Sequence, residues 1–357
     1  MPRLLPRLAS VVLALGLASA LGACSSSTTS PAAPDSVDGP SFVLITPTAV
    51  EPGTFLQYAV DGVSAAAAAL DASLEILEPT DTTTAQENID AAMLENPTVI
   101  IGLTDGVLTE FDYTAASNLA QQFLLIDSAA LEPTGNLSAA LFRDYEADYL
   151  AGVEAGSLAS GTDSVAIVSP AATAFVDSQA GPFLAGVASV DPTQKPVIGN
   201  IGTEESATQA QADAQAASFA KDGATIVQAV GFGPGTTLFE AAATDDFLTF
   251  GHHVDQCAAA PGHVIDSTIN RVDVAAEAAL RDVLAGTTGL IASYGLAEGA
   301  VSLASLEPGT SGCTVLDHPE VMTAVADARD AIIAGTVIVD DPTYADPTIQ
   351  PQPEPTP

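Results

Sequence analysis

The chain has 357 residues, a formal net charge of -37 at pH 7, and only eight Lys and Arg together. This acidity excludes nucleic acid as a partner, because phosphate binding needs clustered Lys and Arg. A hydrophobic content of 47% is enough for buried cores, and these must be built from Ala, Val, Leu and Ile because Trp is absent. Composition favours a solubility adaptation, for example to salt, over an acid-dependent function as the origin of the charge.

The N-terminus is predicted to be a targeting segment. Residues 1–23 combine a basic start with an apolar run over 8–20, and the sequence Leu-Gly-Ala-Cys that ends at Cys24 matches the bacterial lipobox. An ordinary signal peptide with a chance Cys is the alternative, and the Ser/Thr run after Cys24 favours the lipoprotein. Residues 24–40 are a flexible tether. No other apolar run approaches the roughly 20 residues that span a bilayer, so we expect an extracytoplasmic protein anchored to the cell membrane by lipid on Cys24.

From residue 41 onward, short strand-like runs alternate with longer Ala-rich helical runs. Such alternation predicts parallel sheets with helices on both faces. The first round has predicted strands at 42–46, 74–77, 98–101, 123–126 and 139–142, and predicted helices at 53–70, 82–94 and 114–122.

The pattern then restarts, which predicts a second α/β lobe. It has predicted strands at 164–168, 197–201, 225–230, 247–251 and 264–268, and predicted helices at 145–159, around 182–188, at 208–219, from 236, and at 272–284. Residues 287–340 add one or two strands and a helix at 319–334. We assign 41–143 with 272–312 to the first lobe, 144–271 with 313–340 to the second, and the Pro-rich residues 341–357 to a disordered tail.

Polar side chains are concentrated where the strand at 247–251 ends, which is where the ligand crevice of an open parallel sheet lies. This loop holds His252, His253 and Cys257, with His263 close behind. An oxidising compartment favours a disulfide between Cys257 and Cys313. A metal site is the alternative, but no Cys-x-x-Cys spacing supports it and loop histidines are usually surface groups. We therefore expect no metal and no cofactor.

Five segments resemble the BMP (basic membrane protein) family of substrate-binding lipoproteins, in matching order and spacing from about residue 42 to 340. They are NLAQQFLLID at 118–127, FRDYEADYLAG at 142–152, GFGPGT at 231–236, FGHHVDQ at 250–256 and VIDSTINRVD at 264–273. The resemblance implies a type I periplasmic-binding-protein fold, whose two Rossmann-like lobes have parallel sheets and are joined by hinge crossovers, here near 143–145 and 270–271. It also implies an ABC permease and ATPase as partners, and a purine nucleoside or riboflavin as the type of ligand.

The resemblance also implies positions for the ligand. Family members that bind nucleosides stack the base between two Phe, and Phe55 falls on the first of these, although it could instead belong to the helix core. Asp127 falls on a binding Asp, although an Asp at a strand end is often a turn residue. The second Phe is missing from its strand near Val227, where Phe232 beside Gly231 could replace it.

Other expected ligand positions depart from the family pattern. Next to Gly251, His253 replaces the Asp that holds the ribose, and Asn270 replaces a Lys. Both side chains still form hydrogen bonds with hydroxyls, but the charge pair is gone. The Asn-Asp pair of the first loop is also replaced, by residues 48–51. We therefore expect a nucleoside that is held differently, or another polar cyclic solute such as a sugar or riboflavin.

We do not expect an enzyme. The chain has neither a Gly-x-Ser-x-Gly elbow nor a Gly-Lys-Ser/Thr phosphate loop, and no nucleophile can be placed beside the His and Asp residues at 252–255. The remaining alternative to transport is a sensor or surface protein of the same fold. A neighbouring permease and ATPase would favour transport, and a neighbouring histidine kinase would favour sensing.

Overall fold

The computed structural model describes residues 39–129, 134–159, 164–170, 174–203, 206–231, 238–309 and 312–340. The predicted signal peptide, Cys24, Phe232 and the C-terminal tail lie outside these residues. The compact unit that begins at Gly39 holds all the helices and strands described below. Within the described residues, no helix is both long enough and apolar enough to span a bilayer.

The first sheet has six parallel strands in the order β11-β5-β4-β3-β1-β2. In the four central strands the apolar side chains are buried on both faces, which is typical of parallel sheets covered by helices. The strands are β1 (Ser41–Ile45), β2 (Ser73–Leu77), β3 (Val99–Leu103), β4 (Gln122–Ile126), β5 (Leu137–Phe142) and β11 (Ile291–Tyr294).

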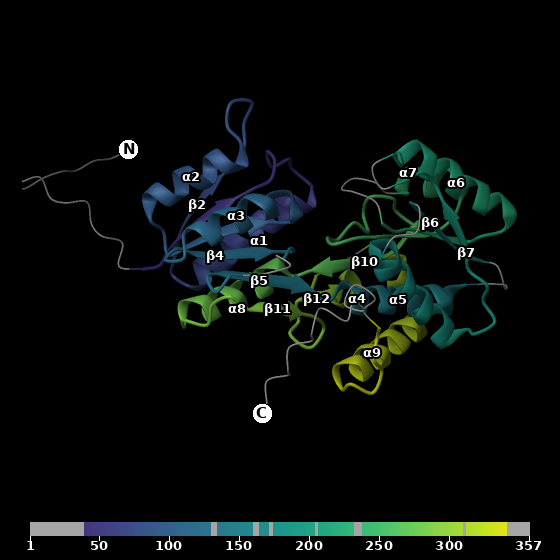
Figure 1. Ribbon diagram of the computed structural model, residues 1–357. Helices are drawn as coiled ribbons and strands as arrows, with labels where there is room; N and C mark the ends of the chain where they lie inside the picture. Colours follow the sequence, from purple (N-terminus) through teal and green to yellow (C-terminus); the bar gives the residue numbers. More distant parts are fainter. Residues whose placement is uncertain are drawn as a thin grey trace, which may run out of the picture. The chain divides into compact units, whose positions relative to one another are not determined.

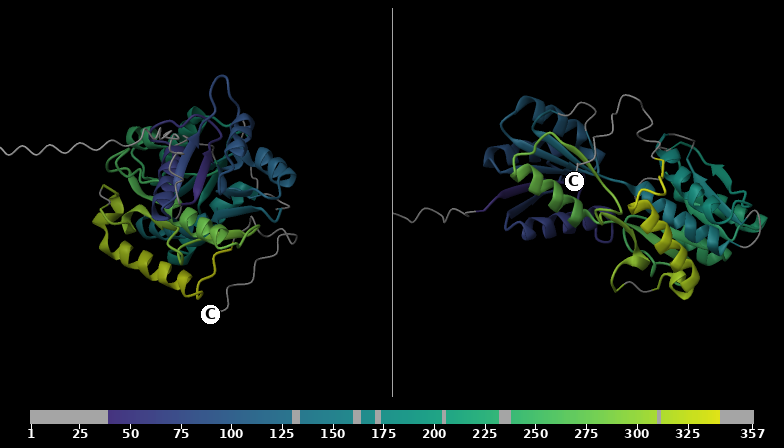
Figure 2. Two further views of the ribbon diagram at one scale, coloured as in Figure 1. Left: turned by 90° about the vertical axis from the view of Figure 1, so that its left-hand side faces the viewer. Right: turned by 90° about the horizontal axis from the view of Figure 1, so that it is seen from below.

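Helices cover both faces of this sheet (Figures 1 and 2). Alternate side chains of the strands pack into two separate cores, one against α1 (Phe55–Ala69) and α8 (Val272–Leu284), the other against α2 (Ala85–Glu95) and α3 (Leu108–Ser117). Thr54 caps α1 by accepting a hydrogen bond from the Gln57 backbone N–H at 3.3 Å, so α1 begins at Phe55.

The second sheet has the same architecture. Strands β7 (Val197–Asn200), β6 (Val165–Ser169) and β8 (Ile226–Ala229) are parallel, and a parallel bridge from Ile226 to Leu248 continues them to β9 (Thr249–Gly251). Next come β10 (Val264–Asn270), parallel to β9, and β12 (Val301–Leu303), which is antiparallel to β10. The predicted α/β class with two mainly parallel sheets is confirmed.

Five helices flank the second sheet: α4 (Asp144–Leu158), α5 (Ala174–Val190), α6 (Gln209–Asp222), α7 (Phe239–Asp245) and α9 (Pro319–Ile333). Helices α4 and α5 pack closely because glycines meet at their contact. A Cβ atom added at Gly152 would overlap the carbonyl oxygen of Phe183, and one at Gly186 would overlap the carbonyl oxygen of Tyr149. Only residues without a Cβ permit this approach.

The chain passes three times between the two groups of elements: from β5 to α4, from β10 to α8, and from β11 to β12. The first two passages coincide with the hinge positions predicted at 143–145 and 270–271. The third lies between Tyr294 and Val301, because β12 pairs with β10 and its apolar side chains join the core of α4.

The predicted helix at 114–122 differs most from the structure. Helix α3 occupies 108–117 and follows a short 3₁₀ turn, η1 (Asp105–Val107), which Thr104 caps. Phe111 faces the core, and the Asn118 amide ends the helix by donating to the Thr114 carbonyl at 2.8 Å. The remaining short 3₁₀ turns are η2 (Ala304–Leu306) and η3 (Thr314–Asp317).

Candidate functional site

Among the described residues, three other than Gly have a left-handed backbone one or two residues after a strand. Thr104 (φ 61°) follows β3, Asp127 (φ 61°) follows β4, and His253 (φ 64°) lies two residues after β9. This conformation is costly for residues with a Cβ and is concentrated at functional sites. All three lie at carboxyl ends of parallel strands, where ligands of such sheets bind. The strained positions therefore mark this edge of both sheets as the candidate site.

The side chains of Phe55 and His253 are in contact, although they belong to elements that flank different sheets. Phe55 opens α1 beside the first sheet, and His253 lies in the loop after β9 of the second. Their ring centroids are 5.2 Å apart, and the rings are tilted by 52°. Two residues predicted from separate parts of the chain are thus in direct aromatic contact.

Asn270, at the end of β10, lies next to His253. Its backbone N–H donates to the His253 carbonyl at 3.1 Å, and the His253 N–H donates to Thr268 Oγ1 at 3.3 Å. The Asn270 side chain is 1% exposed. Its Nδ2 atom and the Nδ1 atom of His253 are both buried with no hydrogen-bond partner among the described residues. A buried polar atom left unpaired costs about 1–3 kcal/mol, so this pair favours a partner that brings its own polar groups.

Burial favours the neutral form of both histidines. Burial lowers the pKa of His253, and contact with the Asn270 side chain acts in the opposite direction. Burial, followed by the charge of His253, lowers the pKa of His252 to about 4, against the opposing hydrogen bond with the Ala229 carbonyl. His252 Nε2 lies 3.0 Å from that carbonyl oxygen and 2.8 Å from Gln228 Nε2. A neutral ring nitrogen either donates to the first or accepts from the second, so His252 is fixed within the sheet edge.

The two predicted glycines shape the loops. A Cβ atom at Gly251 would overlap Ser267 Oγ and lie 2.8 Å from Gln256 Cβ, so the close contact with β10 requires Gly there. Gly231 has φ 72° in the turn after β8, a conformation that Gly adopts at low cost. Both residues therefore have conformational roles in the structure, and their contact with ligand stays a prediction.

Asp127 belongs to a group of carboxylates that the sequence did not reveal. Burial raises its pKa well above the usual value, and the charges of Asp144 and Asp105 raise it further. Asp105 accepts a hydrogen bond from Ser128 Oγ. Asp148, one turn beyond Asp144 in α4, is 7% exposed, and burial and the charge of Asp144 raise its pKa as well. These acids follow three neighbouring strands, and the strand order could have been used to find them.

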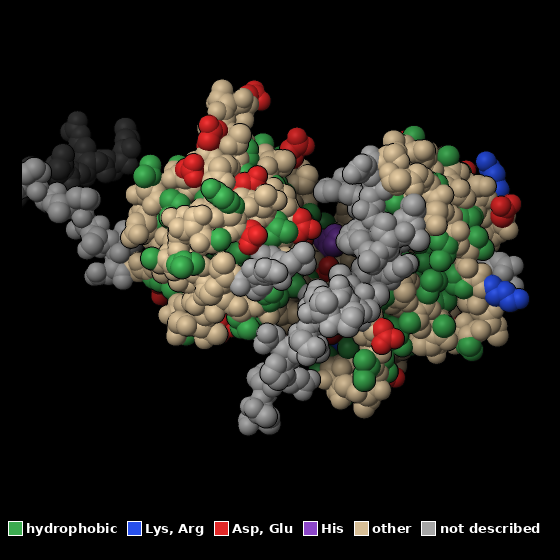
Figure 3. Space-filling view, in the orientation of Figure 1, with side chains coloured by type: hydrophobic (Ala, Val, Ile, Leu, Met, Phe, Trp, Pro, Cys, Tyr) green, Lys and Arg blue, Asp and Glu red, His purple; other side chains and the backbone are tan. Residues whose placement is uncertain are grey.

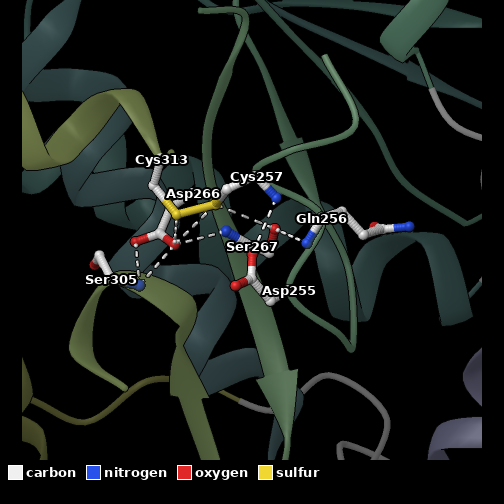
Figure 4. Close-up of a disulfide and its surroundings, with 7 residues drawn as sticks. All are labelled: Asp255, Gln256, Cys257, Asp266, Ser267, Ser305 and Cys313. Atoms are coloured by element: carbon white, nitrogen blue, oxygen red, sulfur yellow. Dashed lines mark hydrogen bonds between the residues drawn. A yellow bond between two sulfur atoms is a disulfide. The ribbon is translucent and has the colours of Figure 1, made fainter. Parts of the chain in front are cut away.

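The loop that positions His253 is fastened by a disulfide (Figure 4). Cys257 in this loop is bonded to Cys313 before η3, with Cα atoms 4.7 Å apart. Asp255 and the two cysteines form a cluster of metal-ligand type, but disulfide sulfurs are not the thiolates that bind metals. Gln256 connects the loop to β10, because its backbone N–H donates to Ser267 Oγ at 3.0 Å.

Two buried carboxyl groups lie behind the disulfide. Asp266 Oδ1 accepts from the backbone N–H groups of Ser267 at 2.7 Å and Ser305 at 3.0 Å, and it is 3.5 Å from Cys313 Sγ. Burial raises the pKa of Asp266 to about 6 despite these hydrogen bonds. Glu154 of α4 is fully buried beside it, and burial followed by the Asp266 charge raises its pKa well above the usual value. The pair therefore retains a proton where isolated carboxyl groups are ionised.

Residues 41–321 match the family described as ABC transporter substrate-binding protein, PnrA-like. The chain belongs to this family. The predicted resemblance is thereby confirmed, and the protein is the substrate-binding component of an ABC transporter. Membership implies a small-molecule ligand, with a permease and its ATPase as partners. No curated protein matches the chain.

Solved structures similar to this substrate-binding protein show its fold. An ABC transporter solute-binding protein from Aeropyrum pernix K1 is 21% identical with a TM-score of 0.62, over 86% of this chain and 95% of that one. A solute-binding protein from Conexibacter woesei is 18% identical with a TM-score of 0.66, over 85% and 99%. A protein from Bacillus halodurans described as a transcriptional activator of the comK gene is 16% identical with a TM-score of 0.67, over 84% and 99%. At these identities the likeness concerns the fold alone.

The structure of the substrate-binding protein brings part of the predicted site together. Phe55, His253 and Asn270 form one group, in which the contacts run from α1 to the ends of β9 and β10. Asp127 belongs to the carboxylate group at the ends of β3, β4 and β5. In Figure 3, a His side chain is visible where the surface is hollowed between the elements of the two sheets.

Proposed function

We propose that this substrate-binding protein closes its two lobes over a nucleoside-like solute and delivers it to the permease of an ABC importer. The observation that carries the proposal is the meeting of Phe55, His253 and Asn270. The Phe55 ring on α1 of the first lobe contacts the His253 ring of the second lobe, and Asn270 is hydrogen-bonded to His253 through its backbone N–H. A flat, polar ligand that separates these side chains would contact both lobes at once.

The chemistry of this group suits a heterocycle with hydroxyl groups. The Phe55 and His253 rings offer faces on which a base can stack. Asn270 Nδ2 is a donor without a partner, and the neutral His253 ring offers one donor and one acceptor. Hydroxyl and ring-nitrogen atoms of a nucleoside supply what these atoms lack. Fixed polar groups in a closed, partly aromatic cleft are typical of small-molecule sites.

Closure would occur about the three crossovers. Arg143 at the first donates through its guanidinium to the Ser293 carbonyl at 2.7 Å, next to the third. Arg271 at the second donates through its backbone N–H to the Ala300 carbonyl at 2.8 Å, also at the third. Hydrogen bonds thus connect the three crossover segments, and a rotation of one lobe against the other would bend these segments together.

Lipidation of Cys24 after removal of residues 1–23 would hold the receptor on the extracytoplasmic face of the cell membrane. The basic start, the apolar run and the Leu-Gly-Ala-Cys sequence support this location. Mass spectrometry of protein isolated from membranes tests it. A diacylated N-terminal Cys24 is the expected result, and an N-terminus elsewhere, or an unmodified Cys24, contradicts the anchor.

A thermal-shift screen tests the ligand class. The protein with Cys24→Ser, which cannot be lipidated, is heated with purine nucleosides, pyrimidine nucleosides, riboflavin and simple sugars. A ligand that binds the folded state raises Tm, and the shift grows with the logarithm of the ligand concentration above Kd. We expect the largest shift with a nucleoside. A shift with sugars alone contradicts the nucleoside and favours a sugar receptor of the same family.

A further inference from the structure

Acidic side chains gather where three neighbouring strands of the first sheet end. Strands β3, β4 and β5 are adjacent and parallel, so their carboxyl ends lie at one edge. Asp105 follows β3 by two residues, Asp127 follows β4 directly, and Asp144 follows β5 by two residues and opens α4. The sheet therefore places three carboxylates side by side at the edge where the proposed ligand binds.

The arginine closest to this group in sequence is committed to other acids. Arg143 Nε donates to Glu146 at 2.6 Å, its Nη2 to Glu298 at 2.5 Å and its Nη1 to the Ser293 carbonyl. Arg271, at the second crossover, is bound in the same way to Asp273 and Glu307. On the face shown in Figure 3, Lys and Arg of the described residues are visible only beside α6 and β7. The charges acting on Asp127 are accordingly those of Asp144 and Asp105, both negative.

Asp148 supplies an independent observation. It lies four residues after Asp144 on α4, and residues at this spacing share one face of a helix. Its side chain is 7% exposed, and within the described ranges no hydrogen bond or ion pair compensates its carboxylate. A buried carboxylate without a donor must either take up a proton or acquire a cationic partner. Asp148 thus lies close enough to Asp144 to feel its charge, and its own carboxylate has no compensating partner among the described residues.

We propose that the ligand presents a protonated amine, or a comparable cationic group, to Asp127, Asp144 and Asp148. An ammonium group carries three donors and one positive charge, which suits several carboxylate oxygens at one edge. The negative charges of these carboxylates repel phosphates, so the site discriminates against nucleotides. This inference rests on the proposed function, because it specifies the charge of the solute that binds in the same cleft.

Isothermal titration calorimetry of the Cys24→Ser chain compares three matched solutes: adenosine, 5′-amino-5′-deoxyadenosine and adenosine 5′-monophosphate. Charge-assisted hydrogen bonds contribute roughly 1.5–3 kcal/mol, which converts to a preference of about tenfold or more. We expect the amine to bind at least about tenfold more tightly than adenosine, and the monophosphate to bind most weakly. Equal affinity for adenosine and its amine overturns the inference, and leaves the proposed function standing with the carboxyl groups protonated.

Asp→Asn variants test whether Asp144 and Asp148 cause the preference for the amine. Asp144→Asn and Asp148→Asn keep the side-chain shape and should each reduce the preference for the amine, whereas Asp90→Asn, on the exposed face of α2, should not. Thermal unfolding of each variant shows whether it is folded. A preference that persists in both site variants overturns the assignment of these residues.

A second set of titrations distinguishes failure of the nucleoside proposal from failure of the cationic-ligand proposal. If none of the three nucleosides binds, the proposed nucleoside function fails, and agmatine and spermidine are titrated against uncharged 1,4-butanediol. Amine binding that Asp148→Asn weakens then supports the cationic ligand without the nucleoside. No binding of any amine overturns the inference as well.

Discussion

The buried pair of Glu154 and Asp266 makes stability depend on pH in a defined direction. Burial raises the pKa of Asp266 to about 6 in the folded protein, from 3.8 for an unburied Asp. The folded state therefore holds a proton that the unfolded chain releases between these values. Because the folded pKa is raised, the stabilisation is complete below pH 3.8, declines as pH rises, and is lost above about pH 6. At 1.36 kcal/mol per unit, this difference amounts to about 3 kcal/mol.

Asp266→Asn isolates this contribution. The amide oxygen still accepts from the backbone N–H groups of Ser267 and Ser305, but the side chain no longer titrates. Urea unfolding at pH 4 and pH 7, followed by circular dichroism, gives the free energy of unfolding of each protein. Between these pH values the wild type should lose about 2 kcal/mol relative to the variant, because Asp266 of the unfolded chain is already partly ionised at pH 4. Asp222→Asn, exposed at the end of α6, should follow the wild type. Parallel pH profiles for wild type and Asp266→Asn would show that Asp266 does not cause this pH dependence of stability.

Two further predictions concern covalent and steric features of the second lobe. The disulfide joins residues 56 positions apart, so reduction should lower the free energy of unfolding by about 4 kcal/mol through the entropy of the unfolded chain. Urea unfolding with and without dithiothreitol measures this loss of stability. The control protein Cys257→Ser/Cys313→Ser should not respond to the reductant. Equal stability of the wild type in both conditions would contradict a stabilising role of the disulfide. Gly152→Ala should separate α4 from α5 and cost at least about 1–3 kcal/mol, while Gly181→Ala, with open space around it, should have little effect. Comparable Tm values for the two Ala variants would contradict the close packing.

Much of the fold followed from local sequence. Apolar runs bounded by Gly and Pro predicted the strands, and Ala-rich runs predicted the helices between them, because a parallel sheet needs crossover segments between its strands. The short strand before the last helix was harder to place from local sequence. Strand β12 has only three residues and is defined by its antiparallel pairing with β10, a contact between distant segments that local patterns do not carry.

The family resemblance predicted three of the ligand positions, Phe55, His253 and Asn270. The structure places these residues in one contact group, and their role in ligand binding stays a prediction. The carboxylates beside Asp127 were missed because Asp105 reads as a loop residue and Asp144 as a helix start. Only the order of strands in the sheet brings them to one edge.

Calorimetric titration of two aromatic variants tests whether the group formed by Phe55, His253 and Asn270 holds a nucleoside-like solute. Phe55→Ala removes the proposed stacking face, and Tyr113→Ala removes an aromatic ring from α3 that is 73% exposed. We predict saturable nucleoside binding to the wild type and to Tyr113→Ala, and affinity weakened by about tenfold or more in Phe55→Ala. Unchanged affinity in Phe55→Ala, or no nucleoside binding by the wild type, would contradict nucleoside binding by this group of residues.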